Sequence, residues 1–281
     1  KFINSTYQLM WNNLVVWFSE INPIHAALIA TIFTWLVTAS GASLVFFFKS
    51  LHRGALDGML GFTGGVMVAA SCFGLLGPAI DQSLGEGFVK VIPAASGFVL
   101  GALFLFLLDK YLPHLHINFK ENESEGIKTD WHRTTLLVLA ITMHNIPEGL
   151  AVGVMFGAAM GDTHMISEAL IVAIGIGIQN FPEGIAVSMP LRRQSVSRFK
   201  SFWYGQLSAI VEPIAGVIGA IAVTQFEPLL PYGLAFAAGA MIYVVVEEVI
   251  PETQRDKYTD IATLGFIGGF VLMMCLDVAL G

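Results

Sequence analysis

The sequence predicts an all-α integral membrane protein with eight transmembrane helices and both termini on the extracytoplasmic side. Three observations support this fold class. Of the 281 residues, 55% are hydrophobic and 12% are charged, which is about half the charge of a typical soluble domain. The apolar residues form eight long runs, each able to cross the roughly 30 Å of hydrocarbon in a bilayer. Lysine and arginine are concentrated in alternate loops, which gives the predicted orientation.

The eight predicted spans begin with a run that contains no Asp, Glu, Lys or Arg. In order, they cover residues 24–48, 56–80, 91–112, 134–160, 169–191, 202–226, 229–250 and 261–280. Spans 1–3 therefore occupy residues 24–112, and spans 4–8 occupy residues 134–281.

The two longest segments outside the spans lie at the N-terminus and between spans 3 and 4. Residues 1–23 are interrupted by Asn and Gln and carry Trp11 and Trp17, so we expect a helix in the membrane interface rather than a ninth span. Residues 113–133 form the long polar connection, which we expect to be a cytoplasmic loop. For its histidines, His114 and His116, a solvated position is favoured over weak metal capture.

The distribution of positive charge predicts the orientation. The loops that follow spans 1, 3, 5 and 7 hold 12 of the 14 Lys and Arg residues. The positive-inside rule places these loops in the cytoplasm. A nine-span arrangement would leave the same loops inside, so charge alone does not exclude it.

Composition also excludes several classes of protein. The low charge argues against disorder, and a net charge of −7 argues against a basic nucleic-acid binder. The two cysteines, Cys72 and Cys275, are too few for a disulfide scaffold and lack the CxxC spacing of a zinc site. The partners that we expect are the lipid bilayer and whatever ion the polar residues within the spans bind.

Two adjacent spans contain a repeated polar motif. Span 4 contains HNIPEGLAV at residues 144–152, and span 5 contains QNFPEGIAV at residues 179–187, with six of nine positions identical. Span 6 adds Glu212, and span 7 ends in EEVIPE, with Glu247 and Glu248. Ionisable side chains at membrane depth are rare because their burial is costly, so each is expected to have a partner or a role.

Depth links three of these carboxylates. Glu148, Glu183 and Glu212 lie within about two helical turns of one plane, at roughly 1.5 Å per residue. In apolar surroundings they would repel one another and take up protons unless a cation lay between them. The sequence therefore predicts a site for a polyvalent cation between spans 4, 5 and 6.

The spacing within each motif favours metal ligation. His144 and Asn145 precede Glu148 by four and three residues, so all three can project from one face of a helix. Gln179, Asn180 and Glu183 repeat these spacings. Imidazole, carboxylate and amide oxygen ligands suit zinc and other first-row divalent ions better than sodium or potassium.

Other residues in these spans have structural interpretations. Pro147 and Pro182 free the carbonyls four residues earlier and are expected to bend their helices. Glycines recur every fourth residue in span 4 and predict a close-packing stripe, comprising Gly149, Gly153, Gly157 and Gly161. Met67, in the middle of span 2, is either a soft ligand or part of the core, and the core is favoured.

These motifs resemble those of the ZIP (Zrt/Irt-like protein) divalent-metal transporters, and most closely the GufA-like branch of that family. The resemblance covers nearly the whole chain from about residue 28. Its strongest segments are HNIPEGLAV, AIGIGIQNFPEGIAVS, GQLSAIVEP, AAGAMIYVVVEEVIPE and LMMCLDVALG. It implies eight transmembrane helices, extracytoplasmic termini, metal influx toward the cytosol and a two-metal centre between helices 4, 5 and 6.

The resemblance also implies which residues hold the metals. One metal would be held by His144, Glu148, Gln179, Glu183 and Glu212, with Met67 alongside. The second would use Asn145, Glu148, Asn180, Glu183 and Glu212, so that the glutamates bridge. Glu247 and Glu248 would lie near the inner end of the route. Asn180 stands where some relatives have Asp, and Glu247 where some have His, so the second site carries one negative charge fewer.

The favoured function is a carrier that moves a divalent metal through this midplane site by alternating access. Zinc is the expected ion, with iron, manganese, copper or cadmium as alternatives. An intramembrane zinc hydrolase or protease would need three ligands and an open coordination position. The HExxH motif typical of such enzymes is missing, because no second His follows His144 at the fourth position.

The sequence leaves three matters open. A metal channel would use the same polar residues as a carrier. A homodimer and a monomer are both compatible with the pattern of spans. The host membrane is either a bacterial inner membrane or the plasma or Golgi membrane of a eukaryote.

Overall fold

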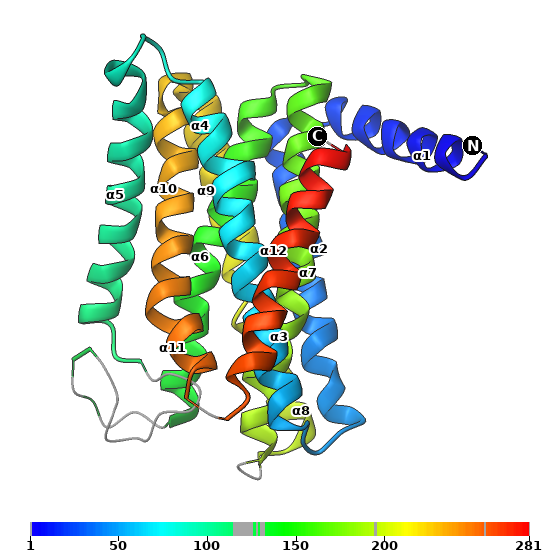
Figure 1. Ribbon diagram of the computed structural model, residues 1–281, viewed down its shortest axis with the longest axis vertical. Helices are drawn as coiled ribbons and strands as arrows, with labels where there is room; N and C mark the ends of the chain where they lie inside the picture. The colour runs from blue at the N-terminus through cyan, green and yellow to red at the C-terminus, as the bar shows by residue number, and fades with distance from the viewer. Residues whose placement is uncertain are drawn as a thin grey trace.

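The computed structural model describes residues 2–114, 126–127, 129, 133–193, 196–255 and 257–280, and in this part of the chain helices are joined by short turns (Figure 1). The prediction of eight spans is confirmed. Among the described residues, eight helical stretches are long and apolar enough to cross a membrane. They are Pro23–Phe46, Arg53–Asp81, Phe88–Tyr111, Thr134–Ala159, Thr163–Arg193, Arg198–Gln225, Glu227–Thr253 and Thr259–Leu280.

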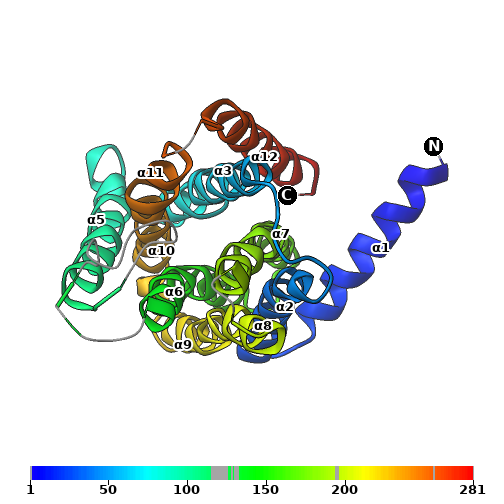
Figure 2. The ribbon, with the colours of Figure 1, turned by 90° about the horizontal axis from the view of Figure 1, so that it is seen from below.

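The spans form two packed groups, which Figure 2 shows along the bundle. The first group contains α3 (Arg53–Ala69), which packs along α12 (Thr259–Leu280), and α5 (Phe88–Tyr111), which packs along α10 (Leu230–Val244). We call it the α3–α12 group, and it comprises α3, α5, α10 and α12.

The second group holds the repeated motif. In it, α6 (Arg133–Ala159) packs along α9 (Val211–Gln225), and α2 (Pro23–Ala42) packs along α7 (Thr163–Arg193), with the short α8 (Arg198–Leu207) beside α7. We call it the α6–α9 group. The two groups meet where α10 contacts α6 and where α3 contacts α7.

Two spans contain π-helical turns that the sequence analysis did not predict. Residues Ala70–Leu76 lie between α3 and α4 (Gly77–Asp81), and residues Val245–Val249 lie between α10 and α11 (Ile250–Thr253). A proline follows each turn by two residues, at Pro78 and Pro251. Because proline removes one hydrogen bond from the helical ladder, a change of hydrogen-bond register just before it is a reasonable consequence.

The sixth span is also interrupted. It ends as α8 at Leu207, passes through a turn at residues 208–210, and resumes as α9 at Val211. Glu212 therefore lies in the first turn of α9, where the positive end of the helix dipole favours a carboxylate. Short 3₁₀ segments, Ser43–Phe46 and Glu227–Leu229, follow α2 and precede α10.

Glycines hold α6 against the backbone of α9. A Cβ atom on Gly149 would lie 2.4 Å from the carbonyl oxygen of Glu212, and one on Gly153 would lie 2.0 Å from that of Gly216. Gly157 approaches the next turn of α9 in the same way. The predicted close-packing stripe is thus confirmed for these three glycines.

Gly161 does not belong to the stripe, and this part of the prediction is wrong. Helix α6 ends at Ala159, and Gly161 has a φ of +88° in the turn that follows. A residue in this left-handed conformation is favoured to be glycine because it has no Cβ. Gly161 therefore continues the four-residue spacing without taking part in the close packing, and its role is to end the helix.

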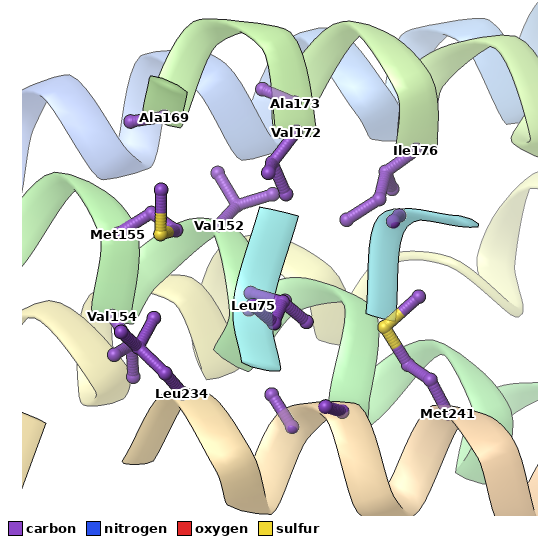
Figure 3. Close-up of a cluster of buried hydrophobic side chains, with 14 of the residues drawn as sticks. Leu75, Val152, Val154, Met155, Ala169, Val172, Ala173, Ile176, Leu234 and Met241 are labelled. Carbon is purple, nitrogen blue, oxygen red and sulfur yellow. The ribbon is translucent and has the colours of Figure 1, made fainter. Parts of the chain in front are cut away.

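The buried apolar core lies between the two groups, on the side of the repeated motif that is nearer the chain termini. Figure 3 shows part of it. It combines Leu75 with side chains of α6, α7 and α10, among them Val152, Met155, Val172, Ile176, Leu234 and Met241. Both ends of the chain lie at this end of the bundle (Figure 1). We refer to this end as the terminal end and to the other as the loop end.

Helix α1 (Phe2–Ser19) leaves the terminal end of the bundle sideways (Figure 1) and is not among the eight stretches. Trp11 donates a hydrogen bond from Nε1 to Ser167 Oγ at 3.0 Å, and Val15 and Phe18 are buried. Leu9 and Met10 are exposed. Its location in the membrane interface stays a prediction.

One expectation for the polar connection at residues 113–133 is wrong. His114 is fully buried rather than solvated, because its Nε2 atom lies 2.8 Å from Asp109 Oδ1 and its Nδ1 atom lies 2.9 Å from the carbonyl oxygen of Leu112. His116 and most of this connection lie outside the described residues.

Candidate metal centre

A cavity of about 30 Å³ lies between the two groups of spans. This volume exceeds the roughly 10–15 Å³ that a cavity needs to hold one water molecule. Helices α3, α6 and α7 and the end of the seventh span contribute its lining. The side chains that bring chemistry to it are Thr63, Met67, His144, Glu148, Glu183, Glu248 and Glu252.

Four residues predicted as ligands of the first metal meet at this cavity: Met67, His144, Glu148 and Glu183. Met67 is 1% exposed and comes from α3 of the α3–α12 group, whereas His144, Glu148 and Glu183 come from α6 and α7 of the α6–α9 group. A soft sulfur atom beside an imidazole and two carboxylates suits a first-row divalent metal.

Glu248 lies closer to the predicted midplane ligands than its position near the inner end of the seventh span suggests. Its Oε2 atom forms a salt-bridge contact with His144 Nδ1. Both residues are mostly buried and both line the cavity. The contact leaves Nε2 as the other ring nitrogen, and a carboxylate on one nitrogen is the usual way in which a metal-binding histidine is oriented.

Glu247 behaves differently from its neighbour. It is partly buried and is not among the described residues that line the cavity. The two adjacent glutamates of EEVIPE therefore face different surroundings, although the resemblance places both near the inner end of the route. Glu248 contacts a predicted midplane ligand, His144.

Glu148 and Gln179 are joined across α6 and α7. Gln179 donates a hydrogen bond from Nε2 to Glu148 Oε1 at 2.5 Å, and both side chains are buried. Among the described residues, Glu148 Oε2 and Gln179 Oε1 have no hydrogen-bond partner. Buried oxygen atoms are nearly always paired, so these two are available to a bound cation.

The carboxylate of Glu212 is fully buried and accepts hydrogen bonds from two neighbouring side chains. Asn180 donates from Nδ2 to both carboxylate oxygens of Glu212, at 2.9 and 3.0 Å, and Thr34 Oγ1 donates to Glu212 Oε2. Glu212 and Asn180 are fully buried. Neither is among the described residues that line the cavity.

Asn145 belongs to the same buried region. It donates from Nδ2 to the carbonyl oxygen of Ser208 at 3.0 Å, and this carbonyl lies in the turn that interrupts the sixth span. Within the described part of the chain, Asn145 Oδ1 and Asn180 Oδ1 have no hydrogen-bond partner. The interruption of the span thus supplies the acceptor that holds Asn145 in place.

The predicted ligands therefore fall into two sets. The cavity set is Met67, His144, Glu148 and Glu183, with Gln179 bonded to it. The buried set is Asn145, Asn180 and Glu212. In the described residues, no group of three or more His, Cys, Asp or Glu side chains is arranged so that it could hold a metal ion as it stands. Gln179 and Asn180 both present their amide nitrogens to neighbouring carboxylates, those of Glu148 and Glu212.

Sequence reasoning missed the contribution of α2. Thr34 contacts Glu212, and the carbonyl oxygen of Thr34 lies 3.4 Å from Asn180 Nδ2. Thr31, Thr34 and Thr38 are all buried. Their spacing of three and four residues in a span without charged residues marks one polar face of a helix, and this signal could have identified them.

Comparison with known proteins adds a family and several relatives. Residues 120–277 match the family described as ZIP zinc transporter. The chain is 43% identical to zinc transporter ZIP11 of Bos taurus, over 92% of this chain and 98% of that protein. It is 39% identical to zinc transporter GufA of Myxococcus xanthus, over 91% and 99%, and 36% identical to zinc transporter ZIPB of Bordetella bronchiseptica, over 87% and 78%.

Proposed function

Because this chain belongs to the ZIP family of zinc transporters, in its GufA-like branch, we propose that it moves zinc across the membrane through the cavity between its two groups of spans. It is a multi-pass membrane protein, and its function is the transport of a divalent metal. The observation that carries the proposed route is the cavity set itself. An imidazole, two carboxylates and a thioether line one cavity within the spans, where such groups are costly unless they serve a cation.

The zinc ion is held first by the cavity set in this proposal. His144 binds through Nε2 while Glu248 holds Nδ1, and Glu148 and Glu183 supply carboxylate oxygens. Gln179 turns its amide so that Oε1 faces the ion. Met67 completes the coordination as a soft ligand alongside.

The buried set serves a second zinc ion only after it opens. Glu212 accepts hydrogen bonds from Asn180 and Thr34, and a metal must replace both of them. Asn180 carries no charge, so the set offers one carboxylate of its own and shares Glu148 and Glu183 with the first ion. Occupancy by one zinc ion is therefore favoured over occupancy by two.

The direction of release follows from where the apolar core lies. A large part of the core packs between the two groups on the terminal side of the cavity, and the smaller cluster of Val45, Ile185 and Met189 lies on the loop side. Glu252, from the last turn of the seventh span, lines the cavity toward the loop end. With the predicted orientation, the loop end is cytoplasmic, and this conformation is the one from which zinc leaves toward the cytosol. Exchange with a conformation open at the terminal end would complete alternating access.

The experiment that tests this route measures zinc uptake. Zinc uptake is followed in proteoliposomes that contain a fluorescent zinc indicator, with manganese, iron and cadmium as competitors outside. Glu183→Gln is expected to abolish uptake because the charge that the cation requires is lost. Glu227→Gln, a change at an exposed residue outside the cavity, is the matched control and should leave uptake unchanged. Normal uptake by Glu183→Gln would exclude the cavity set as the route.

A further inference from the structure

A buried ion-pair cluster lies at the loop end of the cavity. Arg53, the first residue of α3, places Nε 2.8 Å from Asp57 Oδ1 and Nη2 3.2 Å from Glu252 Oε1. The side chains of Asp57 and Glu252 are 2% and 3% exposed, and that of Arg53 is 21% exposed. The proposed function does not use this arginine, although Glu252, which it contacts, lines the cavity.

Two residues of the cluster lie on the same face of α3 as the residues that line the cavity. Arg53, Asp57, Leu60 and Met67 are spaced by four, three and seven residues, so they share one face of α3. Leu60 and Met67 line the cavity. At about 1.5 Å per residue, Arg53 lies roughly 21 Å from Met67 along the helix.

The facing wall has the same arrangement. Glu248 and Glu252 are four residues apart in the seventh span, and both line the cavity. Glu248 contacts His144, and Glu252 contacts Arg53. A metal that moves from the cavity set toward the loop end therefore meets Glu248 first and then Glu252, where a cation is already present.

Electrostatics makes this cation a competitor. Two carboxylates that are almost removed from water need a positive partner, because a lone buried charge is strongly destabilising. The guanidinium of Arg53 stays charged at any physiological pH and is tethered to the helix. Glu252 Oε2 has no hydrogen-bond partner among the described residues, so an arriving metal has an oxygen atom to bind before Arg53 moves.

We propose that Arg53 is a tethered counter-cation that weakens the hold of Glu252 on departing zinc and retakes this carboxylate as the ion leaves. Exit is then the exchange of one cation for another on the same side chain. This exchange prevents zinc from staying bound to Glu252, the last carboxylate on the route. This inference rests on the proposed function, because it concerns zinc leaving the same cavity.

The test measures zinc binding and zinc flux separately in the full-length chain. Purified protein in detergent is titrated with radioactive zinc by equilibrium dialysis, and the same variants are assayed in proteoliposomes. Arg53→Gln is expected to bind zinc about tenfold more tightly, since a unit charge close to Glu252 is removed in partly buried surroundings. Its KM and its maximal rate of uptake should both fall, because release becomes slow.

Two further variants make the result specific. Adding Glu252→Gln to Arg53→Gln should cancel the gain in affinity, because the carboxylate for which the two cations compete is gone. Arg193→Gln is the matched control. Arg193 also lies at the loop end and donates to the carbonyl oxygen of Leu51 at 2.8 Å, so the variant loses the same charge away from Glu252 and should bind zinc as the parent does.

A purely structural role for Arg53 predicts other results. The inference would be overturned if Arg53→Gln lowered thermal stability and maximal rate with zinc affinity unchanged, or if the gain in affinity persisted without Glu252. If Arg53→Gln alone does not fold, Arg53→Gln with Asp57→Asn removes the cation and one of its two carboxylates together and should show the same gain. Absence of zinc uptake by the parent protein would instead contradict the proposed function, and the binding data would still decide the role of Arg53.

Discussion

The imidazole of His144 on α6 contacts the carboxylate of Glu248 in the seventh span, so one pair of side chains joins the two groups of helices at the cavity. This relationship places a carboxylate behind the imidazole that we propose as a zinc ligand. It also means that the two groups cannot slide past each other without breaking or carrying this contact.

Glu248→Gln is expected to weaken zinc binding by about 10- to 100-fold, the usual cost of removing the partner that orients a metal-binding histidine. Competitive titration of purified protein against a chelating zinc indicator measures the affinity. Val246→Ala, at an exposed position two residues earlier, is the control. Unchanged affinity together with lost uptake would assign Glu248 to the exit of zinc rather than to the orientation of His144.

Asn180→Asp is expected to raise the number of zinc ions bound per chain from one to two. The change replaces the hydrogen bonds that Asn180 donates to Glu212 with a second buried carboxylate, whose charge a bound cation would compensate. Without metal, the variant should lose about 1–3 kcal/mol of stability. Equilibrium dialysis and thermal unfolding in chelator give the two quantities. Asn22→Asp, at the exposed N-cap of α2, is the control, and a variant that loses stability but still binds one zinc ion would contradict the role of the buried set.

Gly153→Ala is expected to destabilise the protein by about 2 kcal/mol, in the range of overpacked cores. The added Cβ would lie 2.0 Å from the carbonyl oxygen of Gly216, and backbone atoms cannot turn aside as a side chain can. Gly268→Ala adds the same atom where nothing lies within 4 Å and should be neutral or slightly stabilising. Thermal unfolding monitored by tryptophan fluorescence compares the two, and equal stability of both variants would show that α6 and α9 are not in such close contact.

The orientation can be tested by cysteine labelling in intact cells. Cys72 and Cys275, which are both exposed, are first replaced by alanine. Ser197→Cys, before α8, should then react with a membrane-impermeant maleimide only after the cells are opened, and Glu227→Cys, before α10, should react in intact cells. The reverse pattern would invert the topology. Labelling of both positions from outside would show that the span between them, Arg198–Gln225, does not cross the membrane.

The spans and the repeated motif could be predicted from the sequence because both depend on local signals. Hydropathy over about 20 residues predicts a span regardless of which other spans pack against it. The spacing of His144, Asn145 and Glu148 likewise indicates one helix face without any knowledge of packing. The same reasoning placed three glutamates at one depth, and the structure brings Glu148 and Glu183 to one cavity.

The parts that could not be predicted depend on contacts between distant spans. Thr34 and Glu212 are 178 residues apart, and no local pattern indicates that the first span lies against the sixth. The division of the ligands into the cavity set and the buried set has the same origin, because it depends on which carboxylates Asn180 and Gln179 reach. The interruption at residues 208–210 has only Pro213 as a weak local sign.

The packing of Gly149 against Glu212 has a consequence for the size of ion that the site can accept. Gly149 follows the proposed ligand Glu148 directly, and its neighbour across the contact is the main chain of Glu212, a proposed ligand itself. The distance between the two polypeptide backbones is therefore a hard-sphere distance that no change of rotamer can reduce. Any adjustment to ions of different radius falls to rotation about the glutamate side chains alone. The fixed distance between α6 and α9 therefore limits the range of ionic radii that the site can accept.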